Sequence, residues 1–441
     1  MPTTTRLNRP LRSATARVRA LDRSLALLAG MAFVMQVGVA VMLPLLPLYA
    51  QSLGATPFVL GLLTSGFAIT LAIGQLGAGF MAERVASRRL IVSGIGIYAA
   101  ANILIATSSS ALLLILYRGL AGLGAGVGIV AERLYITAVA DRARLAFANG
   151  IISAAYSAGT VAGPTIGGLL AAGGDLHLPF VVVGITSTLA AVAGLWLPKP
   201  PAERGTTQRS PVERGDAGTA RVDEPAADRA ATDGASNRRR LVVLFVVQAG
   251  FQASFGAFIT TYAPFASERL AWTTAEIGIV FSMFGLGSVL LGPFLARLAD
   301  RRGRRRFGII GAAMILPFVL LYVAEAPRPL LYLSTVVAGA GVTTLEAAWF
   351  ALLSDATDGG RRSRTFSTIV ALSSLGIVVG SVTAAQIWER TGNIGLGMLV
   401  AAAAVGVSGL ALLAHPADDR PKGQSTPTTD SAASSTGSPA S

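Results

Sequence analysis

Apolar stretches long enough to cross a lipid bilayer recur along most of the sequence. An α-helix rises about 1.5 Å per residue, so roughly 20 apolar residues cover a hydrocarbon core of about 30 Å. Hydrophobic residues make up 52% of the chain and charged residues only 13%, which excludes an ordinary soluble domain. The pattern predicts an all-α membrane protein with twelve spans, near residues 24–50, 57–82, 89–107, 111–138, 147–172, 178–197, 241–265, 274–298, 307–324, 329–353, 366–387 and 393–414.

The spans fall into two sets of six, 24–197 and 241–414, separated by a polar segment. Residues 198–240 are rich in Pro, Ala, Asp and Arg and have almost no large apolar residue, so we expect a disordered cytoplasmic linker. Residues 415–441, rich in Ser, Thr and Pro, are expected to be a disordered tail. The Arg-rich residues 1–23 are interpreted as an N-terminal tail, with an organelle transit peptide as the alternative.

Basic residues lie almost entirely on one side of the predicted spans. The chain has 36 Lys and Arg residues, and the exceptions are Arg118, within a helix, and Arg269, Arg328 and Arg390 on the other side. Cytoplasmic loops of membrane proteins carry an excess of Lys and Arg. We therefore expect both termini in the cytoplasm, and the net charge of +13 reflects topology rather than nucleic-acid binding.

The two halves repeat each other. Residues 33–38 (FVMQVG) match 245–250 (FVVQAG), and 124–127 (GAGV) match 339–342. Parallel repeats of this kind place a substrate site near the bilayer midplane, at the interface between the halves.

One stretch of small residues carries a more specific pattern. Gly159, Gly163 and Gly167 are spaced four apart and form a smooth stripe that lets another helix approach closely, while Pro164 introduces a bend. A generic packing face is the simplest interpretation. The spacing, however, resembles at every fixed position the antiporter motif in the fifth helix of drug:proton exporters of the major facilitator superfamily, here Gly150, Gly159, Gly163, Pro164, Gly167 and Gly168. The resemblance implies two pseudo-symmetric six-helix bundles, alternating access and a proton gradient.

Two loops resemble the superfamily's G-x-L-A-D-R-x-G-R-R motif, at residues 79–89 and 296–305. The resemblance implies an ion-pair latch at the cytoplasmic face, although ordinary positive-inside charge would also explain the arginines. The first copy departs from the motif, with Ala86 in place of Gly, so we expect the complete latch to be Asp300, Arg304 and Asp355. The candidate gating residues are Glu83, Arg84, Asp141, Asp300, Arg301, Gly303, Arg304 and Asp355.

Three ionisable residues lie at membrane depth. A charge is energetically costly there, so each of them is a candidate functional residue by default. Arg118 opens a run that resembles the family's fourth-helix motif. Glu132 follows 14 residues later on the same helix face, about 21 Å deeper. Glu346 precedes Asp355 by the nine residues that separate Glu132 from Asp141, so the two carboxyl groups are pseudo-symmetric.

A carboxyl group in an apolar cavity favours its neutral form and releases its proton when water or a cation arrives. We expect Glu346 to carry the coupling proton or to bind cationic cargo, with Glu132 assisting. The alternative places both near the inner ends of their helices, with Glu132 paired to Arg133 or Arg144. The other expected cavity residues are Gln36, Gln248, Gln252 and Trp349, the last being equally compatible with simple packing.

The sequence therefore predicts a monomeric, multi-pass exporter of small hydrophobic or cationic molecules in a bacterial cytoplasmic membrane, exchanging them for protons. The chain has no cysteine and only two histidines, so no metal site or other cofactor is expected. The sequence also has no phosphate-binding loop, which argues against an ATP-driven pump, and we expect no enzyme activity. Two alternatives remain: an exporter or importer of sugars or other metabolites, and a non-transporting membrane sensor on the same fold.

Overall fold

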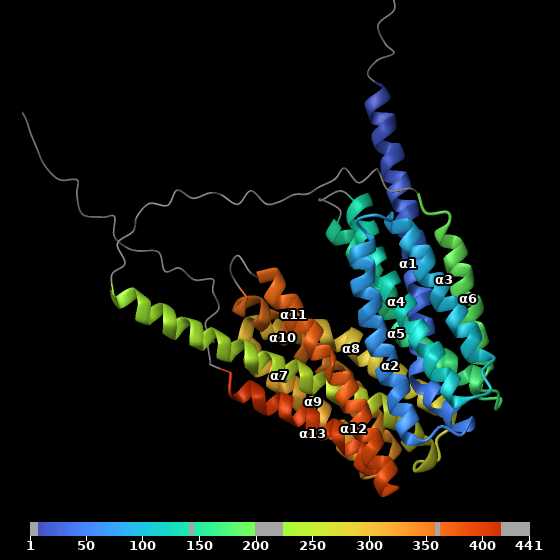
Figure 1. Cartoon of the computed structure of the whole chain (residues 1–441), viewed down its shortest axis with the longest axis vertical. Coiled ribbons are helices and arrows are strands. Elements are labelled where there is room, and N and C mark those ends of the chain that lie inside the picture. Colours follow the sequence, from blue (N-terminus) through green and yellow to red (C-terminus); the bar gives the residue numbers. More distant parts are fainter. Residues whose placement is uncertain (1–7, 141–144, 199–223, 358–361, 416–441) are drawn as a thin grey trace, which may run out of the picture.

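The described part of the chain consists of helices without strands (Figure 1). The computed structural model describes residues 8–140, 145–198, 224–357 and 362–415. The helices are α1 (Asn8–Ser52), α2 (Pro57–Met81), α3 (Ser87–Ala106), α4 (Ala111–Val139), α5 (Leu145–Ala171), α6 (Leu178–Gly194), α7 (Glu224–Glu268), α8 (Thr274–Arg302), α9 (Arg304–Val323), α10 (Arg328–Ala356), α11 (Arg362–Ser374), α12 (Gly376–Thr391) and α13 (Ile394–Leu413).

The all-helical membrane fold expected from the sequence is confirmed. Among the described residues, ten helical stretches are long and apolar enough to span a bilayer, one of them Thr368–Thr391, which joins α11 and α12. Helix α6 is apolar but shorter, with 17 residues. Apart from the starts of α1 and α7, the boundaries agree with the expected ones within a few residues; α2, for example, was expected at 57–82 and spans Pro57–Met81. The full count of twelve spans stays a prediction.

Two helices begin earlier than expected. Helix α1 starts at Asn8, inside the expected tail, and α7 starts at Glu224, inside the expected linker. The structure differs here because Ala, Glu and Arg have high helix propensity even where a segment is too polar for the membrane. The rest of the expected linker and the C-terminal tail lie outside the described residues.

The helices form two bundles, α1 to α6 and α7 to α13 (Figure 1). Their packing repeats: α4 lies against α2 and α3 as α10 lies against α8 and α9, and α6 lies against α3 as α13 lies against α9. The internal sequence repeat therefore corresponds to a structural repeat.

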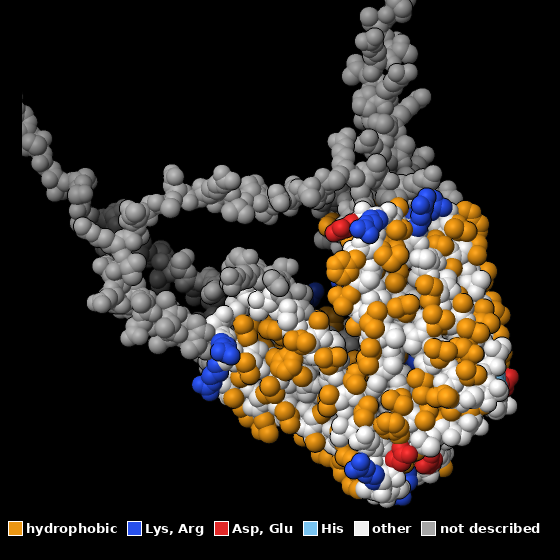
Figure 2. Space-filling view, viewed as in Figure 1, with side chains coloured by type: hydrophobic (Ala, Val, Ile, Leu, Met, Phe, Trp, Pro, Cys, Tyr) orange, Lys and Arg blue, Asp and Glu red, His pale blue; other side chains and the backbone are white. Residues whose placement is uncertain are grey.

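Each bundle has two distinct ends. We call the end where α1 and α7 begin and α6 and α13 finish the tail end, and the opposite end, with the α1–α2 and α7–α8 connections, the turn end. In Figure 2 charged side chains gather near these ends of the visible face, with an apolar band between them. This distribution suits a protein whose sides face lipid.

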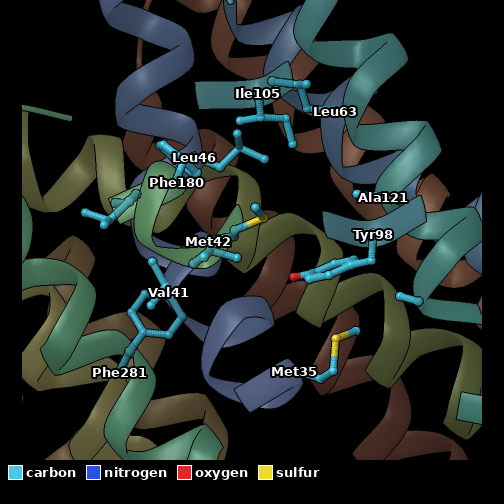
Figure 3. Packing of buried hydrophobic residues seen from close by; sticks show 14 of the residues in the cluster. Met35, Val41, Met42, Leu46, Leu63, Tyr98, Ile105, Ala121, Phe180 and Phe281 are labelled. Atoms are coloured by element: carbon cyan, nitrogen blue, oxygen red, sulfur yellow. The ribbon is translucent and has the colours of Figure 1, made fainter. Parts of the chain in front are cut away.

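The bundles contact each other at the turn end, where α5 packs on α8 and α2 packs on α12. We call this contact region the seam. The Ser65 and Ser381 hydroxyls are 2.8 Å apart, and the backbone N–H of Phe58 donates to Glu389 over 2.8 Å. Figure 3 shows Val41 of α1 beside Phe281 of α8, and Figure 2 shows the surface hollowed between the bundles towards the tail end. The structure is thus closed at the turn end and open towards the tail end.

Candidate functional site

Glu132 lines a small cavity in the N-terminal bundle. The cavity volume is about 30 Å³, enough for a water molecule, and the side chain of Glu132 is 4% exposed. The lining comes from α1, α3, α4 and α5: Met35, Gln36, Val39, Ile95, Ala125, Gly128, Ile129, Glu132 and Tyr156. The helices thus hold one acid in surroundings that are mostly apolar.

The partner of Glu132 is a tyrosine rather than an arginine. The Tyr156 hydroxyl donates to Glu132 Oε2 over 2.6 Å. Arg133, the partner considered from the sequence, has an exposed side chain and no ion pair with Glu132 in the described structure, whereas Arg144 lies outside the described residues. Glu132 therefore faces a hydroxyl donor and no cation among the residues lining its cavity.

Helix α5 extends this polar cluster to α1. One turn after Tyr156, Thr160 accepts a hydrogen bond of 2.9 Å from Gln36 Nε2 and donates to the Tyr156 carbonyl. Gln36 and Glu132 were expected from the sequence, whereas Tyr156 and Thr160 were missed. Their i, i+4 spacing was the signal available, because residues four apart share a helix face.

In the C-terminal bundle, the carboxyl group of Glu346 is half-buried and has no hydrogen bond or ion pair in the described part of the chain. Arg328, the nearest basic residue along α10, is bound to Glu276 instead, over 2.8 Å. The expected isolation of Glu346 from Arg328 is confirmed.

The remaining predicted residues of this bundle lie around α7. The Trp349 indole N–H donates to the Leu244 carbonyl over 2.7 Å, and its ring is 1% exposed within an apolar cluster. These contacts fit the packing interpretation of Trp349 rather than a binding surface. Because α7 and α10 are antiparallel, Gln248, one turn beyond Leu244, lies at the level of Glu346; its Oε1 is buried without a partner. Gln252 lies beside the start of α12.

Arg118 lies apart from Glu132, on the part of α4 nearer the turn end. It is 5% exposed, its guanidinium stacks 3.9 Å above the Phe67 ring, and it contacts the Met42 sulfur at 2.8 Å. Its Nε has no partner, and no carboxylate pairs with it among the described residues. The two groups share a helix but belong to different surroundings.

The glycine stripe of α5 packs on α1, as its spacing predicted. A Cβ on Gly159 would lie 2.9 Å from the Phe33 carbonyl, one on Gly163 2.8 Å from that of Val37, and one on Gly167 2.8 Å from a Val41 methyl. The same motif reaches across the seam. Gly168 lies against the backbone of Thr274, and the Pro164 carbonyl lies against Gly278 of α8. A Cβ on Gly150, in contrast, would have no neighbour within 4 Å.

The C-terminal loop motif forms the ion pairs expected for the latch, whose gating role stays a prediction. Arg304 Nε lies 3.2 Å from Asp300, and Arg304 Nη1 lies 2.5 Å from Asp355, so α8, α9 and α10 are joined within one bundle. Gly303 has a φ of +114°, which an L-residue rarely adopts, whereas Ala86 of the first copy has a φ of −57°. Arg301 is exposed at the end of α8. Glu83 and Arg84 are exposed, and Asp141 lies outside the described residues.

We expect Asp300→Asn to impair transport more than Glu83→Gln. The carboxyl groups of Asp300 and Asp355 are 62% and 60% exposed, so each ion pair contributes about 1 kcal/mol or less to folding. The variant should therefore fold, while the balance between conformations shifts up to about fivefold. Transport assays at matched expression measure the ranking, and the reverse order would contradict it.

The chain belongs to the Major Facilitator Superfamily, whose family model matches residues 28–262 and 244–439. It is 27% identical over 303 residues to the class C tetracycline resistance protein of Escherichia coli, covering 67% of this chain and 72% of that protein. It is 28% identical over 279 residues to the PmrA homolog of Lactococcus lactis, a multi-drug resistance efflux pump, covering 60% and 64%.

Alignments with these and other curated relatives span 42% to 72% of the relative's length. Among solved structures, the fold is similar to that of the nucleoside transporter NupG, with a TM-score of 0.70 at 14% identity, covering 89% of this chain and 98% of that one. At this identity the likeness supports the fold alone.

Proposed function

We propose that this protein is a secondary active transporter that exports small hydrophobic or cationic molecules in exchange for protons. The observation that carries the proposal is the buried carboxyl group of Glu132, in a cavity whose lining supplies no cation. A second carboxyl group, that of Glu346, occupies the pseudo-equivalent place in the other bundle. Acids in such surroundings take up and release protons as water enters and leaves.

The glycine stripe and the relatives support export rather than import. The stripe matches the antiporter motif and packs tightly on α1, and two relatives are described as a tetracycline resistance protein and a multi-drug efflux pump. These names describe the relatives; for this chain they favour drug-like cargo over sugars or nucleosides.

The closed turn end and the open tail end of the structure correspond to one stage of an alternating-access cycle. We place the Arg-rich tail end in the cytoplasm of a bacterial cell, so that both termini lie on the cytoplasmic side of the plasma membrane. The structure then represents an inward-open state, in which the seam closes the outer side. Cargo would enter between the bundles from the cytoplasm, and the protein would act as a monomer with a site at the interface of its halves.

Proton flux in inside-out vesicles tests the function. The vesicle lumen is acidified, and tetracycline, a quinolone, the lipophilic cation tetraphenylphosphonium, a nucleoside and a sugar are added in turn. We expect the first three to dissipate the pH gradient, and vesicles with the Glu132→Gln/Glu346→Gln double variant to show no response. A response to the nucleoside or sugar alone would indicate a metabolite transporter, and no response to any compound would favour a sensor.

A further inference from the structure

Helix α5 contacts three parts of the molecule that a proton-driven exporter must coordinate. Its Tyr156 binds the acid on α4, and its Thr160 binds Gln36 on α1. Nearer the turn end, the backbone N–H and the hydroxyl of Thr165 donate to Ser282 of α8 over 3.1 and 2.7 Å. One helix thus joins the acid to the seam.

The hydrogen bond at Glu132 depends on the charge of the carboxyl group. The Tyr156 hydroxyl lies 2.6 Å from Glu132 Oε2, and a hydrogen bond to an ionised carboxylate is roughly twice as strong as one between neutral groups. A proton on Glu132 removes the charge that strengthens this bond. Protonation therefore loosens the attachment of α5 to α4.

No other charged group in the described cavity competes with this effect. From α1 and α3 the cavity receives Gln36, Met35, Val39 and Ile95, none of which titrates, and from α5 it receives Tyr156. On α4 itself the neighbouring Arg133 has an exposed side chain. The corresponding helices of the other bundle, α11 and α12, contain no tyrosine, so Glu346 has no equivalent attachment there.

We propose that Tyr156 is a positioning residue that transmits the charge of Glu132 to α5 and, through α5, to the seam at α8. The inference rests on the proposed proton-coupled function and adds how the proton acts. With Glu132 ionised, Tyr156 holds α5 against α4 and the seam stays closed. With Glu132 protonated, α5 is released, and the α5–α8 contacts separate.

Distance measurements between spin labels test this assignment, since the chain has no native cysteine. Labels on Ala172→Cys and Ser267→Cys, both exposed near the turn ends of α5 and α7, report separation of the bundles in lipid nanodiscs. The parent protein should show an open fraction that varies with pH. In Tyr156→Phe the variation should vanish or its midpoint should move by about one pH unit, a tenfold change in proton affinity.

Tyr135→Phe is the matched control, because it also removes a tyrosine hydroxyl from the N-terminal bundle. The Tyr135 hydroxyl donates to the Pro198 carbonyl over 2.9 Å rather than to an acid. This variant should keep the parent pH response. In a Glu132→Gln background, adding Tyr156→Phe should change nothing, since the charge is already absent. If Tyr156→Phe follows the parent curve, Tyr156 has only a packing role. If the parent itself shows no pH response, the proton-coupled function fails along with this inference.

Discussion

Replacing Gly163 with leucine should abolish transport while leaving cargo affinity in one conformation nearly unchanged. A Cβ at this position would already lie 2.7 Å from the Ala40 side chain and 2.8 Å from the Val37 carbonyl. Overpacking typically costs about 1–3 kcal/mol, and here the obstacle is backbone, which has no alternative rotamer. Helices α1 and α5 must then separate, and conformations that need their close contact become inaccessible.

Gly150→Leu provides a matched control within the same motif and helix. Gly150 is exposed, and nothing lies within 4 Å of the place where its Cβ would be. We expect this variant to transport at close to the parent rate. Proton-driven uptake into inside-out vesicles and equilibrium cargo binding should be measured at equal protein content. Normal transport by Gly163→Leu would show that the stripe is dispensable.

Glu346→Gln should reduce proton-driven transport to the level of vesicles without the protein. Glutamine has nearly the shape of a protonated glutamate, and Glu346 has no ion pair in the described structure to lose, so the variant should remain folded. If the carboxyl group only couples, downhill exchange of cargo should persist. If it also binds cargo, affinity for tetraphenylphosphonium should fall, while affinity for a neutral compound stays unchanged.

Glu132→Gln separates the roles of the two acids. We expect this variant to keep cation binding and to lose the response of the seam to pH. The reason is that the Glu132 carboxyl group accepts its hydrogen bond from Tyr156 of α5. Parent-level proton-driven export in Glu346→Gln would show that Glu346 is dispensable for coupling and would leave this role to Glu132 alone.

Features local in sequence could be predicted, because helix geometry fixes them. The contact of Gly163 with a neighbouring helix follows from its four-residue spacing. The latch of Asp300, Arg304 and Asp355, in contrast, was expected from the resemblance to the family's loop motif. Long apolar runs likewise set the helix boundaries, since each run must satisfy its own backbone in lipid.

Features that depend on which helices meet could not be predicted. Sequence spacing placed Arg118 and Glu132 on one face of α4, yet α1 and α2 surround the former and α5 approaches the latter. Tyr156 was not predicted as the partner of Glu132, because the pattern of charged residues along the sequence does not reveal an uncharged partner. Trp349 could not be assigned because a single aromatic residue fits packing and binding equally well until its N–H partner is known.

Much of the seam is backbone packed on backbone, with Gly61 facing the Ser381 carbonyl and Gly278 facing that of Pro164. Side chains can yield by changing rotamer, but backbone atoms cannot, so a half-separated seam would lose its contacts without gaining others. Packed surfaces of this kind have two discrete arrangements rather than a continuous range. Ions should therefore find no partly open path through the protein, and bilayers containing it should show the same electrical leak as empty bilayers when cargo is absent.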